Sequence, residues 1–161
     1  MKNFSSSFQA RLLRPAIVEA IEMNRPLSAV AGGVAGTAVL SLLMILTEVQ
    51  TRSQIGTFDV IARFVGLPGK VFVGFALFVV AGVLAWPLLF VALEQSMGDD
   101  RDPATRGVFL GLVLWVVFVI TGSGNLEFPL LVVFGALTLI AHVAYGFTLG
   151  VVYANLRETS E

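Results

Sequence analysis

The chain has 161 residues, of which 57% are apolar and only 13% are charged, and its mean hydropathy is +0.89. Soluble domains average about a quarter charged residues, so this composition favours a protein whose solvent is the lipid bilayer. The absence of cysteine excludes disulfides, thiolate metal sites and thiol nucleophiles, and a net charge of -1 argues against a nucleic-acid binder.

Residues 1–25 are predicted to form a cytoplasmic amphipathic leader. Apolar residues at Ile17 and Ile21 have helical spacing, so one face would lie on the membrane or against the bundle; a partly ordered tail is the alternative. Pro26 is predicted to end this helix and to stand in the first turn of the next one, over residues 27–47.

A short interfacial helix is predicted in the linker after this first apolar stretch. Apolar residues between Phe58 and Val65 fall on one helical face, while Asp59 and Arg63 form an i,i+4 pair on another. Glycine and proline in the segment 66–69 would end this helix, because both residue types favour turns.

The second apolar stretch is predicted as a helix over residues 71–93, with a kink at Pro87. The third is predicted over residues 107–121, and Asp102 is the expected N-cap before it. Asp102 and two neighbouring carboxylates, Asp99 and Asp100, invite a calcium-loop interpretation. Their spacing lacks the glycine and the distal glutamate of such a loop, so no metal site is expected.

The fourth helix is predicted over residues 129–153, which completes a transmembrane domain at 26–157 and leaves a cytoplasmic tail at 158–161. Charge-free stretches of 22, 23, 20 and 29 residues separate the charged clusters, and about 20 apolar helical residues cross a bilayer core. The sequence therefore predicts an all-α fold: an integral membrane four-helix bundle with short amphipathic N-terminal and interfacial helices.

The distribution of basic residues predicts how this bundle is oriented. Seven Lys and Arg residues lie on the side of the two termini, and three lie on the other side. Because cytoplasmic loops carry the excess of basic residues, we expect a multipass protein of the cell membrane with both termini in the cytoplasm.

Small residues recur at i,i+4 spacing on three of the predicted helices. In lipid, close approach of backbones at small residues helps to hold helices together. We expect helix packing at Gly32, Gly33, Gly36, Gly107, Gly111, Gly146 and Gly150. The first and fourth helices are predicted to form the tightest, antiparallel pair.

His142 is the only histidine, and it lies near mid-depth of the fourth helix. Buried polar groups in a membrane need partners, so we expect a hydrogen bond between His142 and Thr37, with Tyr145 nearby. Thr138 and Ser41 would lie one turn away at a common depth. This candidate polar centre is interpreted either as a structural contact or as a proton relay. No cofactor is expected, because bis-histidine haem would need a second histidine from another subunit.

Three segments of the first and fourth predicted helices resemble those of a known family: Gly33–Thr37 (GVAGT), His142–Gly146 (HVAYG) and Leu149–Tyr153 (LGVVY). They resemble the uncharacterised small four-helix inner-membrane proteins of the YagU-like type in prokaryotes. The resemblance implies four helices and a role for the segment at His142, and it implies no activity or ligand.

Two functional classes follow from these observations. The first is a structural or accessory membrane protein, a homo-oligomer or a subunit of a larger membrane complex, which packs through its small-residue faces. The alternative is a channel or transporter for protons or a small solute that uses His142. An enzyme is not expected, because the buried residues do not assemble a nucleophile, a base and an orienting group.

Overall fold

The computed structural model describes residues 3–51, 56–94, 96, 101–124 and 126–158, and every regular element among them is helical. The elements in chain order are α1 (Asn3–Gln50), α2 (Thr57–Phe64), α3 (Val71–Val80), a π-helical segment η1 (Ala81–Ala85), α4 (Trp86–Glu94), α5 (Pro103–Gly122) and α6 (Leu130–Glu158). The predicted all-α fold is confirmed.

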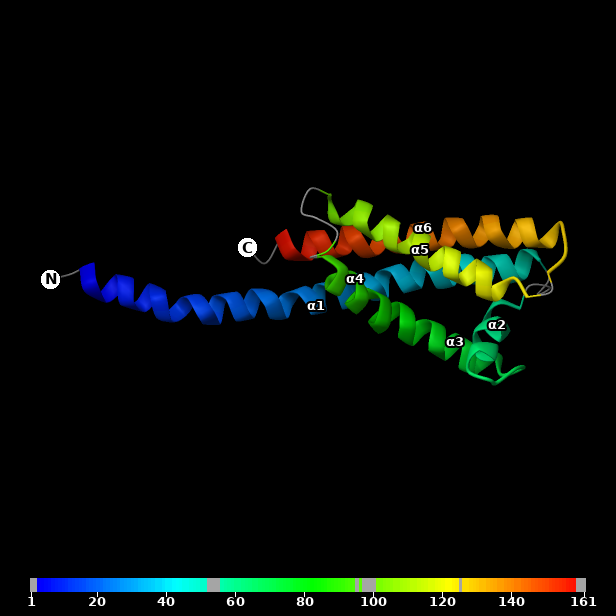
Figure 1. Cartoon of the computed structure of the whole chain (residues 1–161), viewed down its shortest axis with the longest axis horizontal. Coiled ribbons are helices and arrows are strands. Elements are labelled where there is room, and N and C mark those ends of the chain that lie inside the picture. The colour runs from blue at the N-terminus through cyan, green and yellow to red at the C-terminus, as the bar shows by residue number, and fades with distance from the viewer. Residues whose placement is uncertain (1–2, 52–55, 95, 97–100, 125, 159–161) are drawn as a thin grey trace.

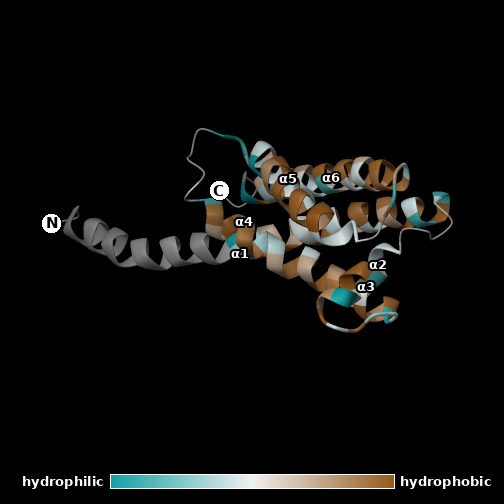
Figure 2. Cartoon of the chain, turned by 45° about the vertical axis from the view of Figure 1, so that its right-hand side comes forward, coloured by the Kyte–Doolittle hydropathy of each residue, from teal (hydrophilic) through white to brown (hydrophobic). Residues whose placement is uncertain are grey.

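Four helical segments in the described part of the chain are long and apolar enough to cross a membrane. They are Arg25–Gln50, Val71–Glu94, Pro103–Gly122 and Leu130–Arg157, with 26, 24, 20 and 28 residues. Each predicted span coincides with one of them to within a few residues. Figure 2 shows that these helices are hydrophobic along most of their length, and many of their large apolar side chains are exposed.

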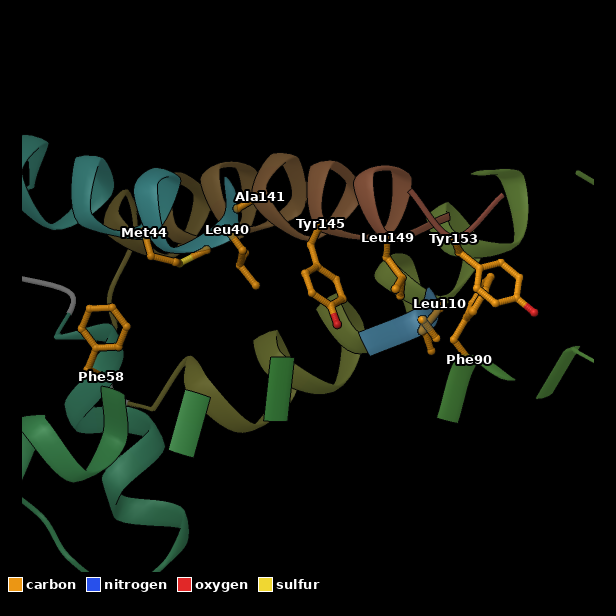
Figure 3. Close-up of a cluster of buried hydrophobic side chains, with 10 residues drawn as sticks. Leu40, Met44, Phe58, Phe90, Leu110, Ala141, Tyr145, Leu149 and Tyr153 are labelled. Carbon is orange, nitrogen blue, oxygen red and sulfur yellow. The ribbon is translucent and has the colours of Figure 1, made fainter. Parts of the chain in front are cut away.

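The helices α1, α5 and α6 run along one direction, while the rod formed by α3, η1 and α4 crosses them obliquely and carries α2 at its far end (Figure 1). Helix α6 packs against both α1 and α5, and α1 also packs against η1 and α4. A buried cluster between them runs from Met44 and Phe58 at one end to Phe90 and Tyr153 at the other (Figure 3).

The structure differs from the prediction at the start of α1. The helix continues through Pro26 without a break, so residues 1–25 and the first span are not separated by a helix end there. An internal proline removes one backbone hydrogen bond, and the bonds of the adjoining turns maintain the helix. The amphipathic face predicted between Ile17 and Ile21 lies outside the side chains that the structure describes.

The short helix predicted in this linker is confirmed as α2. Arg63 donates to Asp59 on its outer face, and Phe58 and Ala62 are buried against α3. Gly66 and Gly69 end the segment with φ of +72° and +79°, a left-handed conformation that glycine adopts without strain. The carboxylate of Glu48 at the end of α1 accepts a hydrogen bond from the backbone N–H of Thr57, which fixes the start of α2.

The second span contains a π-helical turn directly before the predicted kink residue. The N–H of Trp86 donates to the carbonyl of Ala81, an i to i-5 bond. The next bond of this pattern would join residue 87 to the carbonyl of Gly82, but Pro87 has no N–H. The carbonyl of Gly82 is therefore left for a partner outside its own helix.

Glycines mark the closest helix contacts. A Cβ added to Gly32 would lie 2.6 Å from the carbonyl oxygen of Leu149, and one added to Gly36 would lie 2.9 Å from the ring of Tyr145. These two contacts join α1 to α6. Contacts between α5 and α6 are made by Gly107, Gly111, Gly146 and Gly150, where an added Cβ would press on the backbone of the facing helix.

Candidate functional site

The structure does not bring the five residues of the predicted polar centre together at one contact. His142 and Thr138 belong to the row of α6 that faces α5, whereas Tyr145 belongs to the row that faces α1. Thr37 faces Gly82 of η1, and Ser41 lies partly buried one turn further along α1.

The predicted hydrogen bond between His142 and Thr37 is therefore wrong. Nδ1 of His142 lies 2.7 Å from the carbonyl oxygen of Thr138, one turn earlier in the same helix. The hydroxyl of Thr138 donates to the carbonyl of Phe134 in the same way. The hydroxyl of Thr37 is buried against Gly82 and has no hydrogen-bond partner among the described residues.

Tyr145 makes the long-range polar contact that sequence reasoning assigned to His142. Its hydroxyl donates to the carbonyl of Gly82 at 2.8 Å, and the ring is fully buried. Figure 3 shows this ring pointing away from α6 into the buried cluster, beyond Leu40. Gly82 lies twelve residues from both Lys70 and Glu94, so the contact lies near mid-depth of the second span.

A cavity of about 470 Å³ lies beside this contact. Residues of every element contribute to its walls, which are mostly aliphatic and aromatic; the polar side chains on it are those of Thr121, His142 and Tyr145, with the indole of Trp86. Val117 and Phe64 line it and are 54% and 53% exposed. The cavity is therefore open at the side of the bundle, between α5 and α2.

His142 forms part of the inner wall of this cavity. The residue is 7% exposed, and its ring lies 5.2 Å from the ring of Phe118, tilted by 40°. One ring nitrogen, Nδ1, contacts the carbonyl of Thr138. No hydrogen bond to Nε2 is found in the described part of the chain, and this atom is not among the fully buried polar atoms that lack a partner.

A second polar group at the ends of α4, α5 and α6 was missed by sequence reasoning. The carboxylate of Glu94 accepts from the hydroxyl of Tyr153 at 2.7 Å, and it forms ion pairs at 3.4 Å with Arg106 and Arg157. The side chains of Glu94 and Arg106 are 11% and 6% exposed. In the sequence these residues lie at the edges of the predicted spans, and nothing in their spacing indicates that three helix ends would bring them together.

Two carboxylates outside the spans, Asp59 and Asp102, have structural partners. The pKa of Asp59 is lowered, first by the hydrogen bond from Arg63 and then by one from the N–H of Gly69. Asp102 is the predicted N-cap of α5: it accepts from the N–H of Thr105 at 3.0 Å and from the Thr105 hydroxyl, and these bonds lower its pKa. Asp99 and Asp100, the other carboxylates considered for calcium, lie outside the described residues.

No group of three or more His, Asp or Glu side chains in the described part of the chain could hold a metal ion. The polar groups described here are of two kinds. His142 and Tyr145 border an apolar cavity inside the bundle, and Glu94 with its partners ties three helix ends together. The first arrangement can accept a molecule; the second is filled by its own side chains.

Comparison with known proteins gives one match. A family model, described as a family of unknown function (DUF6789), matches residues 23–161. No curated protein and no solved structure matches the chain.

Proposed function

The chain belongs to this family of unknown function, and we propose that it is an accessory protein of the cell membrane that binds an apolar molecule from the lipid phase without catalysis. The observation that carries this proposal is the cavity of about 470 Å³, which has mostly apolar walls and is lined by residues from every helix. Binding sites for small molecules commonly have volumes of about 300–1,000 Å³, apolar walls and a few placed polar groups.

The position of the cavity supports a ligand from the bilayer. Its open side lies among Val117, Phe64 and Val65, which are apolar and about half exposed. On helices that cross a membrane, this opening would face lipid chains. A molecule dissolved in the bilayer could then enter sideways without passing through water.

Association with other protein chains through the small-residue helix faces has less support than ligand binding. Gly32, Gly36, Gly107 and Gly146 all contact other helices of the same chain. These faces are occupied inside one molecule, so a homo-oligomer or a larger complex would have to use other surfaces. The binding role does not depend on such an assembly.

A proton or solute path through His142 is the alternative function. The geometry supports it less, because Nδ1 of His142 is held by its own helix and the cavity around the ring is mostly apolar. A conducting path needs a succession of polar groups or water along its length.

Relationship and orientation are part of the same proposal. We keep the YagU-like resemblance as a proposed relationship within small four-helix membrane proteins. We also propose that both termini are cytoplasmic, on the basis of the excess of basic residues on their side. The buried Arg106 and the partly buried Arg157 contribute to that excess.

The proposal is tested by identifying what purifies with the protein. After mild detergent extraction, mass spectrometry of the intact protein should detect one apolar molecule bound in about equal amount. Val117→Trp would place a large ring at the cavity opening, and Val116→Trp adds the same ring at a neighbouring position that does not line the cavity. Both valines are about half exposed.

We expect Val117→Trp to lose the bound molecule and Val116→Trp to retain it. Equal retention by both variants would contradict binding in this cavity, as would the absence of any molecule above the level of bulk lipid. Thermal unfolding of both variants in detergent checks that the substitution leaves the fold intact.

A further inference from the structure

We propose that the ligand of this cavity is a lipid alcohol: an uncharged apolar molecule that carries a hydroxyl group as its hydrogen-bond donor. This inference rests on the proposed binding function and adds the chemistry of the ligand's polar end. It follows from the hydrogen bonds that His142, Tyr145 and Thr121 already donate to backbone carbonyls of the protein.

At His142, the partner of one ring nitrogen defines the role of the other. Nδ1 lies 2.7 Å from the carbonyl oxygen of Thr138, and a carbonyl can only accept, so Nδ1 carries the hydrogen. A charged ring is costly within a membrane, and in the neutral ring Nε2 then has a free lone pair. The residue is 7% exposed and borders the cavity, so this lone pair is an acceptor available to a ligand.

The two hydroxyl groups on the cavity, like Nδ1 of His142, already donate their hydrogens to backbone carbonyls. The hydrogen of the Tyr145 hydroxyl is donated to the carbonyl of Gly82, and that of Thr121 is donated to the carbonyl of Val117 at 2.6 Å. Each oxygen keeps lone pairs and has no hydrogen left to give. Three polar side chains on this cavity therefore offer acceptors.

A ligand with one donor can satisfy Nε2 of His142, the acceptor among the three whose atom makes no hydrogen bond. A hydroxyl does so, and its oxygen can also accept from the indole N–H of Trp86 on the same cavity. An ether or a ketone lacks the hydrogen that Nε2 of His142 requires. A carboxylate would bring a negative charge toward lone pairs, and no Lys or Arg is found among the residues that line the cavity.

The two tryptophans of the chain can report separately on binding in the cavity and on partition into the surrounding lipid. Trp86 lines the cavity, whereas Trp115 lies outside its lining and donates through Nε1 to the carbonyl of Gly135. These are the only two tryptophans. Trp115→Phe leaves Trp86 to report on the cavity, and Trp86→Phe leaves Trp115 to report on partition into the surrounding lipid.

The experiment compares two probes in vesicles that contain each single-tryptophan protein. Dodecanol with a terminal bromine and its methyl ether share a quenching atom and an apolar chain, but only the alcohol has a donor. We expect the alcohol to quench Trp86 at a roughly three- to tenfold lower concentration than the ether, the range for one hydrogen bond. Both probes should quench Trp115 equally.

His142→Phe keeps an aromatic ring beside Phe118 and removes the acceptor. In the Trp115→Phe background, it should bring the two probes to equal affinity. If this variant does not fold, the comparison of alcohol with ether in the protein that retains His142 still decides the question.

The results separate the two proposals. Equal quenching of Trp86 by alcohol and ether, above that of Trp115, would overturn the requirement for a hydroxyl and leave apolar binding intact. If neither probe quenches Trp86 more strongly than Trp115, the proposed binding function itself fails. A preference for the alcohol that persists in His142→Phe would remove His142 as the acceptor.

Discussion

The hydroxyl of Tyr145 on α6 donates a hydrogen bond to the backbone carbonyl of Gly82 at 2.8 Å. That carbonyl is unpaired within its own helix. The π-helical pattern would pair it with the N–H of the residue five positions later, but that residue is Pro87, which has no N–H. A proline in the second span thus leaves a carbonyl that a tyrosine of the fourth span pairs, and both Gly82 and Tyr145 line the cavity.

Tyr145→Phe should destabilise the protein. It would remove the hydroxyl and leave the carbonyl of Gly82 unpaired in an apolar interior, at a cost of about 1–2 kcal/mol. Unfolding in detergent measures the change. Pro87→Ala supplies an N–H near the same carbonyl, so Tyr145→Phe should cost less in the Pro87→Ala background. If Tyr145→Phe lowers the unfolding free energy equally with Pro87 and with Pro87→Ala, the missing N–H of Pro87 is not the reason that the Gly82 carbonyl pairs with Tyr145.

Much of the fold could be predicted because charge fixes where lipid-spanning helices end. Glu48, Lys70, Glu94 and Arg106 lie at or near the boundaries of the helices that the structure shows. Which helix each face meets could not be predicted from spacing. On α6, the rows containing His142 and Tyr145 are adjacent, and the choice between α1 and α5 for each depends on packing of the whole bundle.

The candidate site shows the same division. His142 was recognised from its position in an apolar helix, and it does border the cavity. Its expected partner, Thr37, was chosen by depth alone, although depth says nothing about which side of a helix a residue occupies. The cavity itself arises where the rod of α3 and η1 crosses the other helices, and no residue pattern encodes that angle (Figure 1).

Gly146→Ala should separate α5 from α6. An added Cβ would press directly on the backbone carbonyl of Gly107, which cannot move independently of its helix. We expect a loss of about 1–3 kcal/mol in unfolding free energy, the range for overpacking. Gly135→Ala on the same helix is the control, since a Cβ there meets nothing within 4 Å. A similar loss in both variants would contradict the close contact.

Glu94→Gln should weaken the junction of three helix ends. The change keeps the shape of the side chain but removes the charge that faces Arg106 and Arg157, both within 3.4 Å. Because the Glu94 side chain is only 11% exposed, the cost should be about 3 kcal/mol, measured by thermal or chemical unfolding.

The control for this effect is an ion pair at the surface. Asp59→Asn removes the partner of Arg63, whose side chain is 59% exposed, so the unfolding temperature should change little. If both substitutions had equal effects, burial would not be the reason that the Glu94 cluster matters.

Orientation can be measured directly because the chain contains no cysteine. Ser123→Cys lies after α5 on the side predicted to be external, and Ser96→Cys lies after α4 on the cytoplasmic side. A membrane-impermeant maleimide should label the first in intact cells and the second only after lysis. The reverse pattern would overturn the expected cytoplasmic termini, and the unmodified chain gives the background.

The N-cap at Asp102 should make the start of α5 sensitive to acid. Hydrogen bonds from the hydroxyl and N–H of Thr105 hold the pKa of Asp102 below its ordinary value of 3.8. A carboxylate with a lowered pKa stabilises the fold fully above the pKa of the unfolded chain, and this contribution is lost as the pH falls through the lower, folded value. Asp102→Asn keeps an acceptor for the cap but does not titrate.

The difference in unfolding temperature between the parent protein and Asp102→Asn should therefore stay constant from pH 7 to about 5 and move in favour of Asp102→Asn below about 4. A constant difference across the acid range would show that the Thr105 bonds do not stabilise the ionised carboxylate.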